Sequence, residues 1–280
     1  MTDKSNPYGE TTGHVWDDTL AELTNPPPKW WMMGLHASWI LVLVYTIVYP
    51  AWPLPGGATK GVTGWTSIGE YKADLQAIDA VRAQYEDKLP GMSVGAILAD
   101  SELTNYVVRS AKVLFGDNCA ACHGTGGSGN PGYPVLVDDD WLFGGNIDTI
   151  SQTIHNGRRG MMPAHGKMLS AQEVDELAKA VASGNPNASP LFLQKGCIAC
   201  HGMDGKGNQM LGSANLTDGI YRFAAADQLA SVKYTIEHGV NDPSDPMTRV
   251  AVMPKFGGTK LSESDLKKLA VYVHQLGGGQ

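Results

Sequence analysis

The sequence is short of cysteine and of positive charge, and each shortage excludes a class of protein. Four cysteines in 280 residues are too few for a scaffold held together by disulfides. The 21 lysines and arginines are outnumbered by 28 acidic residues, which gives a formal net charge of −7 at pH 7. Nucleic acid is therefore not an expected partner, because affinity for phosphate comes from clustered Lys and Arg.

Apolar residues, by contrast, are plentiful and make up 42% of the chain. A wholly disordered chain would be poorer in apolar groups, so we expect a folded protein. A length of 280 residues leaves room for about two ordinary domains and some additional segments. With 34 glycines and 16 prolines, much of the chain is expected to form loops.

No charged residue occurs in 30–49, a run of twenty residues. A helix of that length would extend roughly 30 Å, the hydrocarbon thickness of a bilayer. Trp30 and Trp31 stand at one end of the run and Tyr49 and Trp52 at the other, as expected of aromatic residues at the two membrane interfaces. We therefore predict a transmembrane helix over 30–49, with membrane lipid around it.

Two other interpretations of this run fit less well. A cleaved signal peptide has a shorter apolar core, a basic start and a small-residue cleavage site, whereas this run is longer, follows an acidic stretch and leads into no such site. A buried helix of a soluble protein would need apolar surroundings, and little else in the chain is apolar enough to supply them.

The C-terminal part of the chain contains an internal duplication. Each copy has, in order, a C-x-x-C-H-G motif, an aromatic-x-Phe triplet, a Thr-Ile-x-x-Gly motif, a Met-Pro pair and a final helix that starts with an N-cap box. These features occupy 119–124, 141–143, 153–157, 162–163 and 170–173 in the first copy and 197–202, 221–223, 235–239, 253–254 and 262–265 in the second. The duplication predicts two similar domains, each with its own chemistry.

C-x-x-C-H is the sequence to which c-type haem is attached. Cysteines three residues apart lie on one side of a helical turn, so both can form thioethers with the vinyl groups of one porphyrin. The adjacent histidine then points at the iron. The motif therefore predicts two covalently attached haem c groups. The expected thioether and axial histidine residues are Cys119, Cys122 and His123 in the first copy and Cys197, Cys200 and His201 in the second.

Other uses of paired cysteines fit less well. A thioredoxin-like C-x-x-C needs no following histidine and would rarely occur twice. A four-cysteine zinc site usually has its pairs about 15–20 residues apart, whereas 74 residues separate Cys122 from Cys197. A zinc site would also leave both histidines unexplained, and structural disulfides would not explain the symmetry of the two copies.

The second axial ligand is expected to be methionine, because a thioether favours the reduced iron and raises its potential. Met162 and Met253 are preferred, since each precedes a proline at matching places in the two copies. Most methionines fill gaps in cores, so neighbouring ones remain as alternatives. These alternatives are Met161, Met168, Met210 and Met247.

Four histidines outside the motifs offer nitrogen ligands instead. His155, His165 and His238 lie within the two copies, but such histidines are more often surface groups or neighbours of a ligand. His36 lies inside the predicted membrane helix. Since the chain supplies no second histidine in the membrane for a b-type haem, contact with a neighbouring helix is the favoured role of His36.

These features predict a mainly α-helical fold with one N-terminal transmembrane helix followed by two tandem cytochrome c-type haem domains. Helical spacing of apolar residues also predicts a helix from Ile68 through about Lys88 and another from Ser101 towards Phe115. The expected divisions are a cytoplasmic N-terminal segment over 1–29, the transmembrane helix over 30–49, a linker with an amphipathic helix over 50–100, and haem domains over 101–186 and 187–280.

Haem attachment also predicts how the chain is oriented. Thiols must be handled outside the reducing cytosol, so the haem domains are expected on the periplasmic side of a bacterial inner membrane. The single-pass chain would then have its N-terminus in the cytoplasm. The lysines that flank the membrane run are nearly balanced in number, and the argument from haem attachment outweighs them.

Further motifs accompany the two C-x-x-C-H-G copies and the two Met-Pro pairs. They are His14-Val15-Trp16-Asp17-Asp18, Glu22-Leu23, Asn25-Pro26, Pro28, Trp30-Trp31 and Gly64-Trp65-Thr66-Ser67. Over nearly the whole chain this combination resembles the CcoP (FixP) subunit of cbb3-type cytochrome c oxidases. Some relatives have two membrane helices where this chain shows one, and Asp18 and Pro27 stand where relatives often have Gly and Leu.

The resemblance implies a membrane-anchored dihaem cytochrome c that delivers electrons to an oxygen-reducing partner subunit. The family's ligands carry over as two sets, the first with Met162 and the second with Met253. The implied sets are Cys119, Cys122, His123 and Met162, and Cys197, Cys200, His201 and Met253.

The expected role is electron relay, because two six-coordinate irons leave no open position for oxygen or peroxide. The partners implied are the catalytic and monohaem cytochrome subunits of the oxidase, with a cytochrome c or a cytochrome bc complex as donor. A net acidic chain would favour a basic donor. The competing hypotheses are a dihaem peroxidase, the cytochrome subunit of a periplasmic dehydrogenase, and a free membrane-tethered shuttle.

Overall fold

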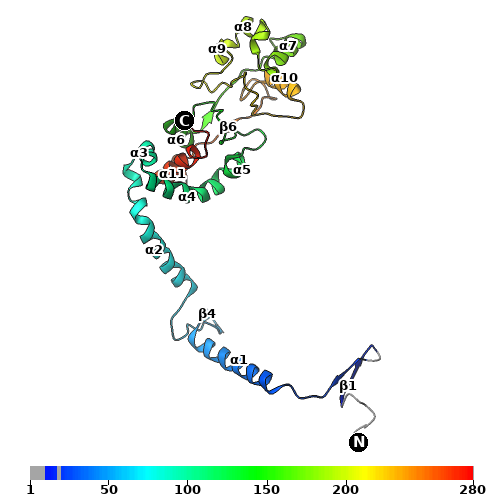
Figure 1. Cartoon of the computed structure of the whole chain (residues 1–280), viewed down its shortest axis with the longest axis vertical. Coiled ribbons are helices and arrows are strands. Elements are labelled where there is room, and N and C mark those ends of the chain that lie inside the picture. The colour runs from blue at the N-terminus through cyan, green and yellow to red at the C-terminus, as the bar shows by residue number, and fades with distance from the viewer. Residues whose placement is uncertain (1–9, 18–19, 280) are drawn as a thin grey trace. The chain divides into compact units, whose positions relative to one another are not determined.

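The computed structural model describes residues 10–17 and 20–279, so Asp18 lies outside the described residues. The described chain is mainly helical, as the sequence predicts (Figure 1). It forms two compact units, Met1–Val81 and Arg82–Gln280. Both C-x-x-C-H motifs belong to the second unit.

The first unit begins with an antiparallel hairpin of β1 (Thr11–Trp16) and β2 (Leu20–Leu23). Helix α1 (Lys29–Val48) follows directly after Pro28. Proline is suited to a helix start, because it lacks the N–H that would have no partner there. The carbonyl of Pro28 accepts the first helical hydrogen bond, from the N–H of Met32 at 3.1 Å.

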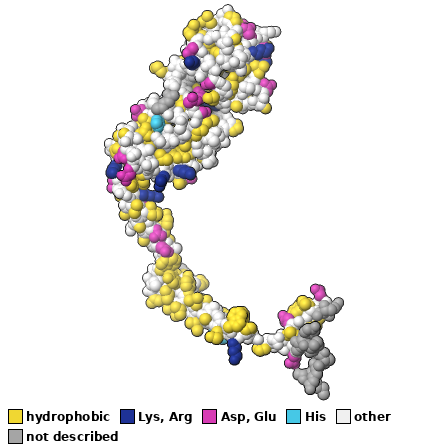
Figure 2. Space-filling model, viewed as in Figure 1, with side chains coloured by type: hydrophobic (Ala, Val, Ile, Leu, Met, Phe, Trp, Pro, Cys, Tyr) yellow, Lys and Arg dark blue, Asp and Glu magenta, His cyan; other side chains and the backbone are white. Residues whose placement is uncertain are grey.

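Helix α1 is apolar on all sides, and none of its residues is buried. Among the described residues it is the one helix whose length and composition allow it to cross a membrane. Its bounds agree within one residue with the predicted span over 30–49. Figure 2 shows the apolar side chains that cover this helix, which lipid rather than protein would have to surround.

A small hairpin of β3 (Pro53–Leu54) and β4 (Gly57–Ala58) follows α1. The predicted amphipathic helix is α2 (Ser67–Glu86). Its apolar side chains, such as Ile68 and Tyr71, are exposed in the described chain. The last turn of this helix differs, because Tyr85 packs against buried residues of the second unit that include Leu89 and Leu103.

The second unit has three clusters of buried hydrophobic residues, of which a smaller one joins Leu89, Ile97 and Leu103. The two larger clusters carry the C-x-x-C-H motifs, and the first of them is here called core A. It is formed by α3 (Val94–Ala99), α4 (Ser101–Asn118), α6 (Ile147–Asn156) and α11 (Glu263–His274). Helix α4 presents apolar residues at spacings of four, which gives it one buried face. The buried residues of core A include Ala111, Phe115, Ile150, Ile154, Leu269 and Ala270.

The second core, core B, is formed by α7 (Ala171–Ala182), α8 (Leu191–Gln194) and α10 (Gln228–His238). Its buried residues include Val174, Leu177, Ala178, Phe192, Val232 and Ile236. Short elements complete the unit. They are η1 (Leu89–Gly91), α5 (Ala120–His123), η2 (Thr125–Gly127), β5 (Arg158–Arg159), η3 (Pro186–Ala188), α9 (Ile198–His201) and β6 (Val252–Met253).

The two repeats exchange their final helices. Helix α7 ends the first repeat but packs against α10 of the second, and α11 ends the second repeat but packs against α4 and α6 of the first (Figure 1). The division expected between residues 186 and 187 therefore separates the repeats in sequence, whereas each core takes residues from both sides of it. The cause is the path after α6, where Gly157 ends the helix with φ 71° and Arg158–Arg159 run along β6.

Both final helices start with the predicted N-cap box. In α7, Ser170 Oγ accepts the N–H of Glu173 at 3.3 Å, and the Glu173 carboxylate accepts the N–H of Ser170 at 2.8 Å. In α11, Ser262 and Asp265 form the same pair of bonds, both at 3.1 Å. These bonds satisfy backbone donors that a helix start leaves free, and they confirm the prediction.

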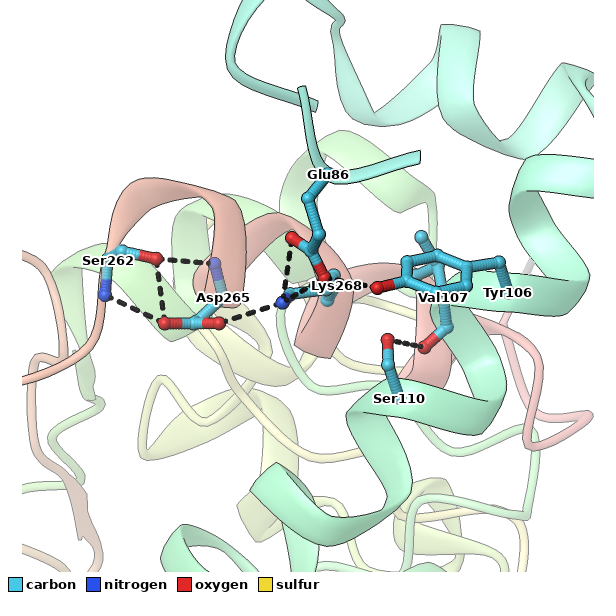
Figure 3. Close-up of polar contacts among 7 residues, drawn as sticks. All are labelled: Glu86, Tyr106, Val107, Ser110, Ser262, Asp265 and Lys268. Carbon is cyan, nitrogen blue, oxygen red and sulfur yellow. Dashed lines mark hydrogen bonds and ion pairs between the residues drawn. The ribbon is translucent and has the colours of Figure 1, made fainter. Parts of the chain in front are cut away.

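A buried ion network joins the start of the second unit to core A (Figure 3). Lys268 on α11 is 7% exposed, and its Nζ lies 3.1 Å from Glu86 and 3.0 Å from Asp265. Glu86 also accepts the hydroxyl of Tyr106 on α4 at 2.6 Å. The end of α2 is thereby fixed to two helices of core A.

Candidate haem sites

Each C-x-x-C-H-G motif forms one helical turn that ends at the histidine. In the first copy α5 ends at His123, and the N–H of Gly124 bonds to the carbonyl of Ala120 at 2.9 Å. Gly124 has φ 74° and its counterpart Gly202 has φ 78°, a region that residues with a Cβ rarely adopt. A Cβ on Gly124 would also lie 2.6 Å from the carbonyl oxygen of Gly129. The glycine after each histidine therefore ends the turn and allows the loop to pass close by.

The two motif histidines are held in the same way. His123 Nδ1 lies 3.1 Å from the carbonyl oxygen of Pro134, and His201 Nδ1 lies 2.9 Å from that of Ala214. Since a carbonyl only accepts, Nδ1 carries the proton in both rings and Nε2 keeps a lone pair. Burial lowers the pKa of both imidazoles, which favours the neutral form. Each ring is thus fixed in the tautomer that binds a metal through Nε2.

The four cysteines are free thiols in the described structure. Burial raises the pKa of Cys119 to about 11, and it also raises the pKa of Cys197. No group of three His, Cys, Asp or Glu residues that could hold a metal ion is found in 10–17 and 20–279. Cys119 packs on core A and Cys197 packs on core B, so the two motifs lie on different cores.

The two Met-Pro segments also lie on exchanged cores. Met253, from the second repeat, packs on core A together with Cys119, and Met162, from the first repeat, packs on core B together with Cys197. The ligand sets implied by the resemblance join Met162 to the first motif, and the structure does not bring those residues to one core. The chain crosses between the cores before each methionine, which a comparison of spacings within one repeat does not reveal.

The backbone around the two methionines shows the same exchange. Met253 on β6 pairs with Arg158 on β5, and the N–H of Phe256 bonds to the carbonyl of Ile154 at 3.1 Å. Met162 forms a bridge with Val240, and the N–H of His165 bonds to the carbonyl of Ile236 at 3.0 Å. Each methionine segment is therefore bonded to the end of the helix that carries the other copy's Thr-Ile-x-x-Gly motif.

The glycines of those motifs explain the close approach. Gly157 has φ 71° and Gly239 has φ 67°. A Cβ on Gly157 would overlap the carbonyl oxygen of Met253, and one on Gly239 would overlap that of Met162. The sequence motif Thr-Ile-x-x-Gly thus marks the place where each repeat receives the other's methionine segment.

The other methionines and histidines that could bind iron are more exposed, or their side chains face other groups. Met161, Met168, Met210 and Met247 are 54–93% exposed, whereas Met162 and Met253 are partly buried against a core. Two of the histidines face carboxylates instead: His155 Nε2 lies 3.4 Å from Glu263, and His238 Nδ1 lies 3.1 Å from Asp245. In α1, His36 Nδ1 lies 2.6 Å from the carbonyl oxygen of Met32 in its own helix.

The residues around each motif fit a porphyrin. Each core has a matched set of partly buried apolar side chains beside the attachment cysteine, which a flat apolar ring would cover. The set is Leu136, Trp141 and Met253 on core A and Leu216, Tyr221 and Met162 on core B. Thioether-forming thiols, a neutral imidazole and a methionine are also the donors that haem c takes.

One residue that the sequence did not single out supports this fit. The Nε of Arg222 is buried and has no hydrogen-bond partner in the described part of the chain. Its carbonyl accepts the N–H of Gly132, in the loop that also supplies Pro134 to His123. Burial lowers the pKa of this guanidinium, and the carboxylate of Asp140 acts in the opposite direction. The propionates of a porphyrin would offer an acceptor for the Nε that Asp140 does not bond. The sequence held one signal for Arg222, because it is a charged residue that stands between two aromatic residues, Tyr221 and Phe223.

Comparisons with known proteins agree with the geometry. The family described as the N-terminal domain of cytochrome oxidase-cbb3, FixP, matches residues 8–55. The family described as cytochrome C oxidase, cbb3-type, subunit III, matches residues 107–179 and 190–273, which is more than half of the chain.

Two relatives match nearly the whole chain. The cbb3-type cytochrome c oxidase subunit FixP of Azorhizobium caulinodans is 40% identical over 96% of this chain and 94% of its own. The subunit CcoP of Cereibacter sphaeroides is 35% identical over 96% of this chain and 95% of its own. Together with α1, these matches make the chain a membrane-anchored, haem c-binding protein of respiratory electron transport. It belongs to the FixP/CcoP family of cbb3-type cytochrome c oxidase subunits.

Proposed function

We propose that this chain carries two haem c groups and relays electrons to the oxygen-reducing subunits of its oxidase. The observation that supports this most is the combination found on each core. On each core, the first cysteine of a C-x-x-C-H turn and a partly buried methionine pack against the same cluster, and the histidine that ends the turn is held by a backbone carbonyl. Each haem, when bound, supplies reversible one-electron exchange between ferric and ferrous iron.

The ligand sets of the proposal follow the cores rather than the repeats. Cys119 and Cys122 would hold the first haem by thioethers, and His123 and Met253 would bind its iron. Cys197 and Cys200 would hold the second haem, and His201 and Met162 would bind its iron. The packing of Met253 beside Cys119 and of Met162 beside Cys197 supports this pairing.

The role of the protein in this proposal is to supply every ligand of both irons, which would be one histidine and one methionine for each haem. The bonds from His123 and His201 to backbone carbonyls fix the imidazoles, and a methionine ligand would favour the reduced state of the iron. Neither site then has an open position for oxygen or peroxide. A dihaem peroxidase would need one, so the methionine on each core favours relay over peroxidase chemistry.

The anchor and the charge suggest how electrons enter and leave. In the proposed topology residues 1–29 are cytoplasmic, α1 crosses the inner membrane once, and the haem sites are periplasmic. The anchor keeps the sites beside the catalytic and monohaem cytochrome subunits, which raises their effective concentration. A net charge of −7 favours a basic cytochrome c as donor, with a cytochrome bc complex as the other source.

The proposal is tested on the full-length protein purified in mild detergent from membranes of its native host. Intact mass spectrometry is expected to show two added haem groups, and Cys119→Ala with Cys122→Ala is expected to remove one of them. Co-purification with a copper–haem oxidase is the expected association. A mature chain without any added macrocycle, or one that accompanies a soluble dehydrogenase, would contradict the proposal.

A further inference from the structure

Asn241 lies where the two methionine segments meet. It is 4% exposed and has φ 52°, a left-handed conformation that asparagine tolerates better than most residues. Its Nδ2 donates to the carbonyl of Gly160 at 2.6 Å and to that of Ala251 at 2.9 Å. Its Oδ1 accepts the N–H of Ala251 at 2.9 Å. Both amide donors and the acceptor are thus used.

The three bonds reach both methionine segments at equivalent places. Gly160 comes two residues before Met162, and Ala251 comes two residues before Met253. One side chain therefore bonds the segment from the first repeat and the segment from the second. The backbone N–H of Asn241 also bonds to the carbonyl of Arg249 at 2.7 Å, which holds the second segment close.

The first repeat has no asparagine at the position of Asn241. Counted from the glycine of each Thr-Ile-x-x-Gly motif, Arg159 occupies the position in the first repeat that Asn241 occupies in the second. Arg159 is exposed and lies in β5, where it pairs with Val252. The described structure accordingly has one amide at the crossing, and it serves both segments.

The next residue reaches only one segment. Asp242 is 7% exposed, and its Oδ2 accepts the N–H of Ala164 at 2.7 Å, two residues after Met162. Its other carboxylate oxygen accepts the N–H of Ser244 within its own loop. Asn241 and Asp242 therefore bracket Met162 from both sides, whereas Asn241 alone also holds the approach to Met253.

We propose that Asn241 is a positioning residue for the sulfur ligands of both haems, and that it couples the two sites mechanically. The inference rests on the proposed function, because it concerns ligands of the proposed haems. Loss of the amide leaves buried carbonyl and N–H groups of both segments without partners, so each segment can move away from its core. One substitution in the second repeat then weakens methionine ligation at both irons.

The test compares three variants of the full-length haem-loaded protein in detergent. Asn241→Gly keeps the positive φ and removes the amide, Asn241→Asp keeps the shape and removes both donors, and Asp242→Ala removes the bond to Ala164 alone. The protein is labelled with carbon-13 at the methionine methyl groups. In the ferrous state the porphyrin ring current shifts the methyl resonance of a bound methionine far upfield, so each ligated haem gives its own signal.

We expect two upfield signals in the wild type. In both Asn241 variants both signals should weaken together, and the share of haem that binds carbon monoxide should rise roughly tenfold, as expected when buried hydrogen bonds are lost. Asp242→Ala should affect one signal only. Circular dichroism and the intact mass show whether each variant is folded and carries both haems.

The outcomes separate the two proposals. If one signal or neither changes in a folded Asn241 variant, the inference is overturned while the haem assignment stands. If Asn241→Gly fails to fold, Asn241→Asp decides by the same criterion, and failure of both to fold also overturns it, because a positioning role requires a folded variant. If the wild type has no haem additions by mass, the proposed function itself has failed.

Discussion

The turns that begin at Cys119 and Cys197 differ at the first cysteine, with φ −122° and −59°, but each ends at a histidine bonded to a carbonyl and followed by a glycine of positive φ. The segments that lead to the two methionines differ. Arg159 lies exposed in the first repeat, whereas Asn241 lies buried at the same position in the second. The histidine end of each turn is therefore repeated in both copies, whereas the side-chain amide at the crossing is present in the second repeat only.

The largest expected effects come from deleting equivalent leucines of the two final helices. Leu269 is 1% exposed in core A and Leu177 is 3% exposed in core B. Replacing either by Ala should lower the free energy of unfolding by about 2–5 kcal/mol. Urea titration measures this. In Leu269→Ala, the methionine signal of the haem at Cys119 should shift. A shift of the signal from the haem at Cys197 instead would argue against exchanged cores.

The second pair of substitutions tests the close approach at the crossing. Gly157→Ala and Gly239→Ala each put a Cβ against the carbonyl of the other repeat's methionine at a positive φ. Each should destabilise the protein by roughly 1–3 kcal/mol and broaden one methionine signal. Gly219→Ala is the control, because nothing lies near its Cβ position. If all three substitutions changed stability equally, the motif glycines Gly157 and Gly239 would have no special role at the crossing.

The buried ion network distinguishes core A from core B. Lys268 pairs with Glu86 and Asp265, whereas the same position of α7 has Glu176, which accepts the hydroxyl of Ser189. Lys268→Met leaves two carboxylates without their cation and should cost about 1–3 kcal/mol in thermal or urea unfolding. Lys179→Met breaks an exposed pair with Asp175 and should change stability by less than about 0.5 kcal/mol. Comparable losses in the two variants would contradict this assignment.

The smallest expected effect depends on pH and concerns the N-cap box of α7. A hydrogen bond from Lys195, followed by those from Ser170, lowers the pKa of Glu173 to about 2. A lowered carboxyl pKa contributes stability above the unfolded value, and that contribution is lost as pH falls towards about 2. Glu173→Gln should therefore be less stable than the wild type at pH 7, and urea titrations should converge in acid. If the difference in unfolding free energy between the wild type and Glu173→Gln grew as the pH fell, the assignment of a lowered pKa to Glu173 would be contradicted.

The sequence was most informative about features that are local in the chain. The apolar run of α1, the two C-x-x-C-H turns and the N-cap boxes at Ser170 and Ser262 could all be predicted, because each depends on residues a few positions apart. The exchange of helices could not. Spacing within a repeat is the same whether a final helix packs on its own core or on the other.

Two residues show why the rest of the site escaped prediction. Asn241 has no counterpart in the first repeat, so the duplication itself draws attention away from it. Arg222 lies in a triplet whose equivalent has Leu142, and its buried Nε is apparent only in three dimensions. The positions at which the two repeats carry different residues were therefore informative about the site, but the motifs common to both repeats did not include them.

The most direct test uses a chain that can bind one haem only. With Cys197 and Cys200 replaced by Ser, the remaining haem is the one at Cys119, and Met253→Ala or Met162→Ala is then added. The upfield methionine signal should vanish with Met253→Ala and persist with Met162→Ala. Loss of that signal with Met162→Ala and its survival with Met253→Ala would show that each repeat keeps its own methionine.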